Sequence, residues 1–444
     1  MRRRAPTVAA RQRRHLDRRH RACRADDVFA CAHVRHTAIS TTLDGTDTGD
    51  TEDTDTPACA DPSTVTARRS ASPSLTWNDL PFSNAFYGPD PLVSAIYVPG
   101  ATSGHFAVAG DCSFSENGAA FEAGGMVLFD DDGAYLDQAD VCFDTSIRAS
   151  GCSRSGGCAA GTVMHVTEAD RIVREAHPGF GYPRSPVAYR IVDDAFVLDT
   201  LIFFNDFGFT APAGQLESVS AIAVADGSVW GLAQVAGAAS EVRRYDVDSF
   251  VDQGGTTVTE TPEFGVGPLL AGRVGMSVLV VRDVSAPGLP QVLTIDMGAR
   301  RYQGIRPDPL DPDRFALLWG QGGPDGPAVQ IWHREGTTLE LEQELELTAG
   351  AFGTVALLGD YLATGDCATD PCTIQITRGG VAIEVDQQLP AESFPGSTNM
   401  LEPVALALAP NGVLLVSARA LPGEGNGEVW TYQLDDPDPT CRSR

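Results

Sequence analysis

From about residue 75 onward, short apolar runs alternate along the chain with clusters of Gly, Asp, Asn and Pro. Turn residues close each run before it reaches the length of an ordinary helix, which is typical of β-strands. Residues 277–283 and 314–320 are apolar almost throughout, so we expect strands that are buried on both faces. The pattern predicts an all-β domain over residues 75–436, followed by a short tail at residues 437–444.

One unit of this pattern occurs twice. Residues 220–248 and 404–435 each contain an apolar run, a turn with Gly, a second apolar run, a loop of small residues and a final Glu-Val-x-x-Tyr strand. Glu241 and Tyr245 in the first copy correspond to Glu428 and Tyr432 in the second. A unit of this size that returns along the chain indicates a repeat fold.

Strands that correspond to the end of this unit can be followed through the chain. Their seven anchor residues are Phe129, Val166, Tyr245, Ile295, Trp332, Ile376 and Tyr432. We interpret each as lying on the third strand of its unit, and most spacings between them fit a four-stranded blade of about 40–50 residues. The long interval after Val166 contains residues 187–204, which we interpret either as an eighth, irregular unit or as an insertion.

With these repeats the chain resembles divergent bacterial β-propellers of secreted or envelope proteins, without WD, Kelch or Asp-box signatures, over roughly residues 75–436. The resemblance implies about seven four-stranded blades around a central channel. Six or eight blades, or tandem β-sandwiches, are the alternatives. Because the last unit has only three clear strands, we expect residues 75–87 to supply its fourth strand and close the ring.

The first 74 residues have a different character. Residues 1–40 carry eleven Arg and three Asp but no apolar stretch of signal-peptide length, so they are either a basic disordered arm or, as we prefer, a misassigned start that displaced a signal peptide. Residues 41–74 begin with a tract rich in Thr and Asp that cannot offset the entropy of ordering, which predicts a disordered linker. This tract resembles the linkers that follow the N-terminus of many bacterial envelope proteins.

Charge excludes several function classes. The net charge of −27 contains +8 in residues 1–40, which leaves −35 for the rest of the chain and argues against binding to nucleic acid phosphates. All 32 basic residues are Arg, so a P-loop lysine and a Schiff-base lysine are both excluded. No apolar run is long enough to predict a transmembrane helix.

Eight cysteines follow residue 58, and eight cysteines allow 105 connectivities, so any pairing is a hypothesis. By spacing, Cys367 with Cys372 and Cys152 with Cys158 would each close one loop. The remaining candidate pairs are Cys112 with Cys142, and Cys59 with Cys441, which would lock the ends of the ring. Disulfides on this scale imply an oxidising compartment, so we expect an extracytoplasmic protein, secreted or tethered to the envelope.

The densest carboxylate cluster offers a weak calcium site at Asp130, Asp132 and Asp137. We favour an acidic turn between two strands, because the ligand pattern of a calcium loop is only partly met. The four histidines and four of the tryptophans in the body stand in no metal or catalytic motif, and we interpret them as structural: His105, His165, His177, His333, Trp230, Trp319, Trp332 and Trp430.

We therefore expect an exported, monomeric, non-catalytic binding or scaffold module for an unknown protein, glycan or small ligand, with no catalytic residue assigned and calcium as the one candidate cofactor. The alternative is a propeller enzyme, a metal-dependent lactonase-like hydrolase or a lyase, with its site in the central channel. Three or more converging Asp, Glu, Asn or His side chains in that channel would favour the enzyme. An apolar channel would count against it.

Overall fold

The structure is a computed structural model of the chain. It describes residues 61–76, 94–100, 103–116, 119–140, 159–168, 170–177, 185–201, 216–235, 239–249, 251–275, 277–298, 300–320, 327–347, 355–366, 372–390, 400–421 and 427–440. The chain divides into two compact units, Met1–Pro57 and Ala58–Arg444, and every described residue belongs to the second unit. The basic segment 1–40 expected from the sequence lies outside the described residues.

Apart from one turn of 3-10 helix, η1 (Pro62–Thr64), the described elements are all β-strands, as predicted. Five four-stranded antiparallel sheets follow one another along the chain. They consist of β3 (Ser94–Val98), β4 (His105–Glu116), β5 (Ala119–Asp130) and β6 (Tyr135–Asp140); β7 (Ala159–Glu168), β8 (Arg171–His177), β9 (Ser185–Val192) and β10 (Ala195–Leu201); β11 (Leu216–Ala225), β12 (Ser228–Val235), β13 (Glu241–Asp246) and β14 (Asp252–Thr257); β15 (Thr261–Val266), β16 (Leu269–Val274), β17 (Val278–Asp283) and β18 (Gln291–Asp296); β19 (Arg301–Asp308), β20 (Asp311–Gly320), β21 (Ala328–Glu335) and β22 (Thr338–Glu346).

A sixth sheet has nine strands and joins the two ends of the second unit. Its members are β23 (Val355–Leu358), β24 (Tyr361–Asp366), β25 (Thr373–Arg378), β26 (Val381–Val385), β27 (Met400–Leu408), β28 (Val413–Leu421), β29 (Gly427–Leu434), β1 (Thr66–Arg69) and β2 (Leu75–Thr76). Strand β1 is antiparallel to β29 and parallel to β26, so it links the last two groups of strands into one sheet. The strand pairing therefore gives five separate blades and one larger sheet, and the predicted count of seven blades is not confirmed.

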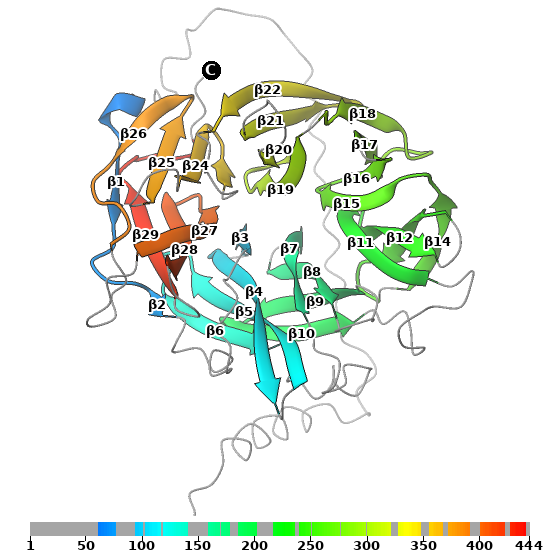
Figure 1. Ribbon diagram of the computed structural model, residues 1–444, viewed down its shortest axis with the longest axis horizontal. Coiled ribbons are helices and arrows are strands. Elements are labelled where there is room, and N and C mark those ends of the chain that lie inside the picture. The colour runs from blue at the N-terminus through cyan, green and yellow to red at the C-terminus, as the bar shows by residue number, and fades with distance from the viewer. Residues whose placement is uncertain are drawn as a thin grey trace, which may run out of the picture. The chain divides into compact units, whose positions relative to one another are not determined.

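The sheets of this unit stand around a common axis, with their first strands innermost and their last strands at the outside (Figure 1). This arrangement is a β-propeller. The hydrophobic core lies between neighbouring sheets. One buried cluster joins Ile96 and Met126 of the first sheet to Ile172 and Tyr189 of the second, which explains why strands of the propeller are apolar on both faces.

The repeated unit occupies equivalent strands in both copies, as predicted. Residues 220–248 cover part of β11 together with β12 and β13, and residues 404–435 cover part of β27 together with β28 and β29. Tyr245 and Tyr432 are both fully buried, on the third strands β13 and β29.

Two anchor assignments were wrong. Val166 lies on β7, the first strand of its sheet, and Ile295 lies on β18, the fourth. The stretch after Val166 is neither an eighth blade nor an insertion, because β9 and β10 are the third and fourth strands of the same sheet as β7. First and third strands are both buried and apolar in a propeller, so hydrophobicity alone does not tell them apart.

The ring is closed from the N-terminal side, and strand β1, which precedes the expected segment, pairs with β29. Of the expected residues 75–87, β2 (Leu75–Thr76) also pairs with β29, and residues 77–87 lie outside the described residues. Residues 66–69 therefore belong to the sheet, and the predicted disordered linker at residues 41–74 extends too far. Val65 and Ala67 are buried there, although the surrounding sequence has no apolar run that would reveal a strand.

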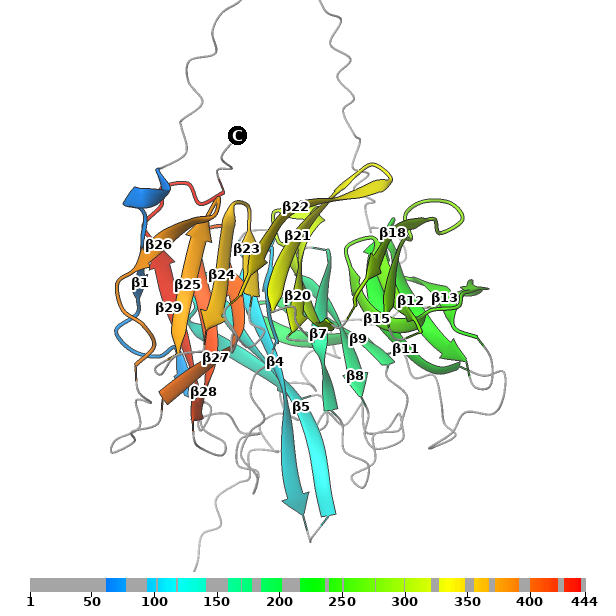
Figure 2. The same cartoon turned by 45° about the horizontal axis from the view of Figure 1, so that its top comes forward.

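Strands β4 and β5 continue beyond their sheet. Pairs from Asp111 with Gly124 to Glu116 with Ala119 form a two-stranded extension, which Figure 2 shows projecting from the ring. Among the described strands, neither β3 nor β6 pairs with the tip of this extension.

Candidate functional site in the central channel

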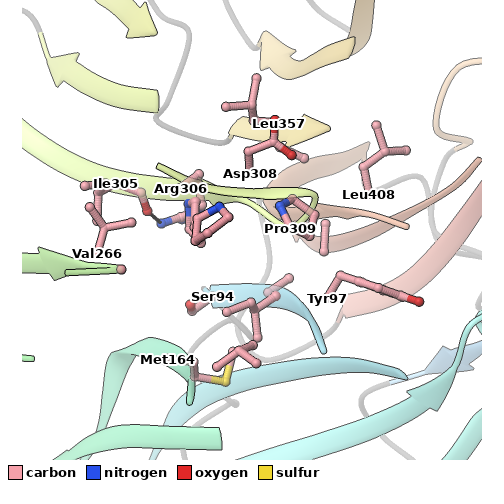
Figure 3. Close-up of a pocket in the computed structure, with 18 of the residues that line it drawn as sticks. Ser94, Tyr97, Met164, Val266, Ile305, Arg306, Asp308, Pro309, Leu357 and Leu408 are labelled. Atoms are coloured by element: carbon pink, nitrogen blue, oxygen red, sulfur yellow. Dashed lines mark hydrogen bonds between the residues drawn. The ribbon is translucent and has the colours of Figure 1, made fainter. Parts of the chain in front are cut away.

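The first strands of the sheets enclose a cavity of about 250 Å³ at the centre of the ring (Figure 3). Residues from β3, β7, β11, β15, β19, β23 and β27 all line it, so every group of strands contributes. The lining also includes Pro99, Gly267 and Pro309, which belong to turns after first strands. The cavity therefore lies at the end of the channel where first strands turn into second strands.

Most of the lining is apolar. Met164, Ile305, Leu357 and Leu408 extend into it from four different strands. The first strands carry apolar residues because their side chains also pack between sheets, and the innermost of these side chains face the channel. The channel wall is thus an extension of the core and not a separate polar site.

Close backbone packing shapes the same wall. A Cβ atom on Gly265 would lie 1.7 Å from the carbonyl oxygen of Ile222, on the first strand of the neighbouring sheet. Gly267, at φ +47°, takes a left-handed turn in which a Cβ would lie 2.6 Å from the oxygen of Pro312. Glycine at these two positions lets β15 approach both neighbours.

Asp308 contributes the one carboxylate among the described residues of the lining, and this carboxylate is already engaged. Its Oδ2 accepts hydrogen bonds from Nη1 of Arg314 and from the backbone N–H of Gly359, each at 3.0 Å. Asp308 and Arg314 are both buried. Nε of Arg314 also donates to Glu342 at 2.7 Å. The Asp308 carboxylate therefore joins two sheets and is held away from a role as a metal ligand or a general base.

Three further residues with polar side chains line the cavity: Ser94, Tyr97 and Arg306. Nη1 of Arg306 donates to the carbonyl of Ile305 at 2.7 Å, which keeps a guanidinium beside the apolar wall. The ring of Tyr97 stands edge-on to Phe106 at 5.5 Å. Burial raises the pKa of Tyr97, and the carboxylate of Asp131 adds to the effect, so its hydroxyl is neutral and acts as a hydrogen-bond donor or acceptor.

Three arginines form ion pairs with carboxylates at this end of the channel, and sequence reasoning did not identify them. Arg171 on β8 contacts Asp248, in the turn after β13, at 3.2 Å, and Arg334 on β21 contacts Asp283 on β17 at 2.8 Å, so each of these pairs joins two sheets. Arg378 on β25 contacts Asp436, which follows β29 of the same nine-stranded sheet, at 2.6 Å. The sequence signal that could have identified these residues is an arginine directly at one end of an apolar strand and near an acidic turn. These ion pairs leave the turns themselves with an excess of carboxylates.

The candidate calcium residues do not gather around one point. Oδ1 of Asp130 accepts from the backbone N–H groups of Asp132 and Ala134, at 3.1 and 2.7 Å, which is the geometry of an Asp-initiated turn. Oδ2 of Asp137 accepts from the N–H of Phe196 in the next sheet. Across the described ranges no group of three or more His, Cys, Asp or Glu side chains could hold a metal ion. Calcium binding stays a prediction.

Two of the histidines, His105 and His333, lie beside carboxylates. His105 begins β4, as predicted, and its Nε2 lies 3.1 Å from Asp194 of the next sheet. His333 on β21 lies 3.6 Å from Asp311. His165 lies on β7, a first strand and not a third, and His177 ends β8.

The described tryptophans pack within and between sheets. Nε1 of Trp319 and of Trp332 both donate to Oε1 of Gln330, and Trp430 donates to Glu428. The guanidinium of Arg244 lies over Trp230, 5.4 Å from its ring centroid. None of these four residues lines the cavity.

Of the eight candidate disulfide cysteines, two fall among the described residues. Cys372 precedes β25 and is disulfide-bonded. Cys112 lies on the extension of β4. The others lie outside the described residues, so all four pairings stay predictions: Cys59, Cys142, Cys152, Cys158, Cys367 and Cys441.

No protein-family model matches the chain, and no curated protein matches it either. Solved structures do. A chain of the mitotic checkpoint complex matches with a TM-score of 0.44 and 12% identity, over 89% of this chain and 99% of its own. The β-propeller domain of the Trilobed protease from Pyrococcus furiosus matches with a TM-score of 0.44 and 7% identity, over 81% of this chain and 98% of its own.

A putative 6-phosphogluconolactonase from Bacteroides uniformis matches with a TM-score of 0.41 and 12% identity, over 66% of this chain and 86% of its own. At this level of similarity no activity or partner transfers from these proteins to this chain. The class is defined by the arrangement of its own sheets: the chain is a β-propeller protein. Among the described residues, no helix is both long enough and apolar enough to span a membrane.

Proposed function

We propose that this propeller is a non-catalytic binding module that accepts an apolar group of its ligand in the central channel. One observation carries the proposal. The channel wall is mostly apolar, and its one described carboxylate, on Asp308, is bound by Arg314 and by the N–H of Gly359. Hydrolases and lyases of the alternative class need converging carboxylates or histidines that remain able to bind a metal or move a proton.

The size of the cavity supports binding of a small group. Pockets for drug-sized ligands occupy about 300–1,000 Å³ and bury most of the ligand. The cavity here measures about 250 Å³ and suits one or two apolar side chains, or the apolar end of a larger molecule. A protein or peptide that inserts a side chain fits these dimensions better than a free sugar phosphate.

Prodan, a neutral naphthalene fluorophore, provides a direct test. We expect its emission to rise and shift to the blue when it binds the wild-type protein. Val224 is partly exposed in the wall, so Val224→Trp should fill the cavity and abolish the change. Val197→Trp, on the outer strand β10, is the matched control and should leave it intact. Val224→Phe serves if the larger residue prevents folding.

The enzyme alternative makes the opposite prediction. Turnover of lactones or glycans that disappears in Asp308→Asn, in protein that still melts cooperatively, would contradict the proposed function. So would prodan binding that Val224→Trp leaves unchanged.

We further propose seven blades and an extracytoplasmic location. The nine-stranded sheet divides naturally at the parallel contact between β1 and β26, which supports β23 to β26 as one blade and β27 to β29 with β1 as another. The disulfide at Cys372 supports an oxidising compartment. Intact mass measured with and without reductant tests the four predicted disulfides through the hydrogens gained on reduction.

A further inference from the structure

We infer that one end of the propeller, where first strands turn into second strands and where the cavity lies, is a docking surface. Its partner is a basic polypeptide segment that inserts one apolar side chain into the cavity. The inference rests on the proposed function and adds the class of partner. It depends on two features that lie side by side, the apolar cavity and the charge of the turns around it.

The turns that surround the cavity are acidic. Those that join first to second strands contain Asp170, Asp226 and Asp360, and no Arg. Asp226 is exposed and follows Val224 of the cavity wall by two residues. The backbone N–H of Asp170 donates to Pro99, which also lines the cavity, at 3.1 Å. Carboxylates therefore stand at the edge of the cavity in more than one sheet.

A second circle of turns, between third and fourth strands, carries further acids. Asp131, Asp132, Asp193 and Asp194 lie in the turns of the first two sheets. The arginines at this end are largely committed: Arg171, Arg314 and Arg378 are buried, and each pairs with a carboxylate. The surface presented to a partner is consequently negative, which attracts a cationic segment and repels an anionic ligand.

The interior of the cavity favours a different kind of ligand side chain from the one that its edge attracts. Arg306 places a guanidinium in the wall, so a lysine or arginine that entered the channel would meet a like charge in an apolar setting. An apolar side chain avoids this repulsion and gains from desolvation. The chemistry that fits is an aliphatic or aromatic anchor flanked by basic residues, the arrangement in which a buried central anchor supplies most of the affinity.

The test uses the full chain and fluorescein-labelled peptides of one design. We expect Gly-Arg-Arg-Leu-Arg-Arg-Gly to bind at least about tenfold more tightly than Gly-Arg-Arg-Ser-Arg-Arg-Gly and than the acidic Gly-Glu-Glu-Leu-Glu-Glu-Gly, by fluorescence anisotropy. Binding should weaken as ionic strength rises to about 0.15 M, because exposed charges are screened. Prodan should be displaced by the first peptide.

A matched pair of variants distinguishes the effect of a carboxylate at the edge of the cavity from the effect of the net charge of the protein. Asp226 and Asp193 are both exposed and both take positive φ, +49° and +51°, which Asn tolerates. Asp226→Asn, beside the cavity, should weaken binding of the basic leucine peptide by about two- to fivefold, the effect of one exposed charge pair. Asp193→Asn, in the outer circle of turns, should weaken binding by less than about twofold, because its carboxylate is further from the peptide that occupies the cavity and is screened more strongly.

Equal affinity for the acidic and basic leucine peptides, or equal effects of the two Asn variants, would overturn the inference. Dodecanoate that displaces prodan while the basic peptide does not would also overturn it, in favour of an anionic ligand at Arg306. In each of these outcomes prodan still binds the cavity, so the proposed function survives. Loss of prodan binding itself would reject the proposed function.

Discussion

The phenolic hydroxyl of Tyr361 donates a 2.5 Å hydrogen bond to the carboxylate of Asp436, which lies 75 residues further along the chain. Both groups are buried, and Nη1 of Arg378 binds the same carboxylate oxygen at 2.6 Å. Burial raises the pKa of Tyr361, and the hydrogen bond to Asp436 adds to it, so the hydroxyl remains a donor across the physiological range. The hydrogen bond from Tyr361 on β24 thereby holds in place the residues that follow β29.

Tyr361→Phe should destabilise the propeller by about 1–3 kcal/mol, because it leaves a buried charged acceptor with one donor fewer. Tyr432→Phe is the matched control. The hydroxyl of Tyr432 is buried without a hydrogen-bond partner among the described residues, so removing it should be neutral or stabilising. Urea unfolding of the two variants beside the wild type measures both effects. Equal losses would show that the contact with Asp436 contributes nothing specific.

Asp308→Ala should cost about 3–5 kcal/mol, because it uncouples a buried ion pair and leaves the guanidinium of Arg314 in the interior. The remaining partner, Glu342, moderates the loss toward the lower end of that range. Asp132→Ala, at an exposed turn, should change stability by less than about 0.5 kcal/mol. A stable Asp308→Ala protein would contradict the structural role assigned to this carboxylate and would reopen the enzyme alternative.

Gly265→Ala should lower stability more than Gly227→Ala. The new Cβ at residue 265 would meet the backbone oxygen of Ile222 at 1.7 Å, so two first strands must move apart. At Gly227, with φ +65°, nothing lies within 4 Å, and only the left-handed backbone conformation is penalised, by about 1–2 kcal/mol. Thermal melting ranks the two variants. The larger loss at residue 265 should be accompanied by altered prodan binding, since Gly265 lines the cavity.

Acid should loosen the closing strand β1. The backbone N–H of Thr66 donates a hydrogen bond to the carboxylate of Asp435 at 2.6 Å, and its hydroxyl donates a second at 2.7 Å. These two bonds, the backbone bond more than the other, hold the pKa of Asp435 below its ordinary 3.8. A carboxyl whose pKa is lower in the folded state stabilises the fold above its unfolded pKa. That contribution decreases as the pH falls through the lowered, folded value.

Asp435→Asn should therefore melt at a lower temperature than the wild type at neutral pH. The difference should shrink once the pH is below 3.8 and the wild-type carboxyl becomes protonated. Melting curves over this pH range measure it. Because Asp435 is exposed, the effect should be small, and a difference that stays constant down to strongly acid pH would exclude its carboxylate as the cause.

The sequence by itself determined the secondary-structure class, the repeat and the equivalence of Tyr245 and Tyr432. Alternating apolar runs and turns carry this information locally, because each blade buries the same strand pattern against its neighbours. The same local information could not separate first from third strands, which misplaced Val166, since both kinds of strand are apolar on two faces. It also did not reveal that Ile295 lies on β18, a fourth strand, where several side chains are exposed.

Tertiary structure alone decided the closing strand and the character of the channel. Residues 66–69 have no apolar pattern and become a strand only because β29 offers an unpaired edge. Asp308 looks like any acidic turn residue in the sequence, and only the arrival of Arg314 and Gly359 from separate strands and turns neutralises it. The channel is assembled from first strands far apart along the chain, so its apolar wall and acidic edge exist only once the ring has formed.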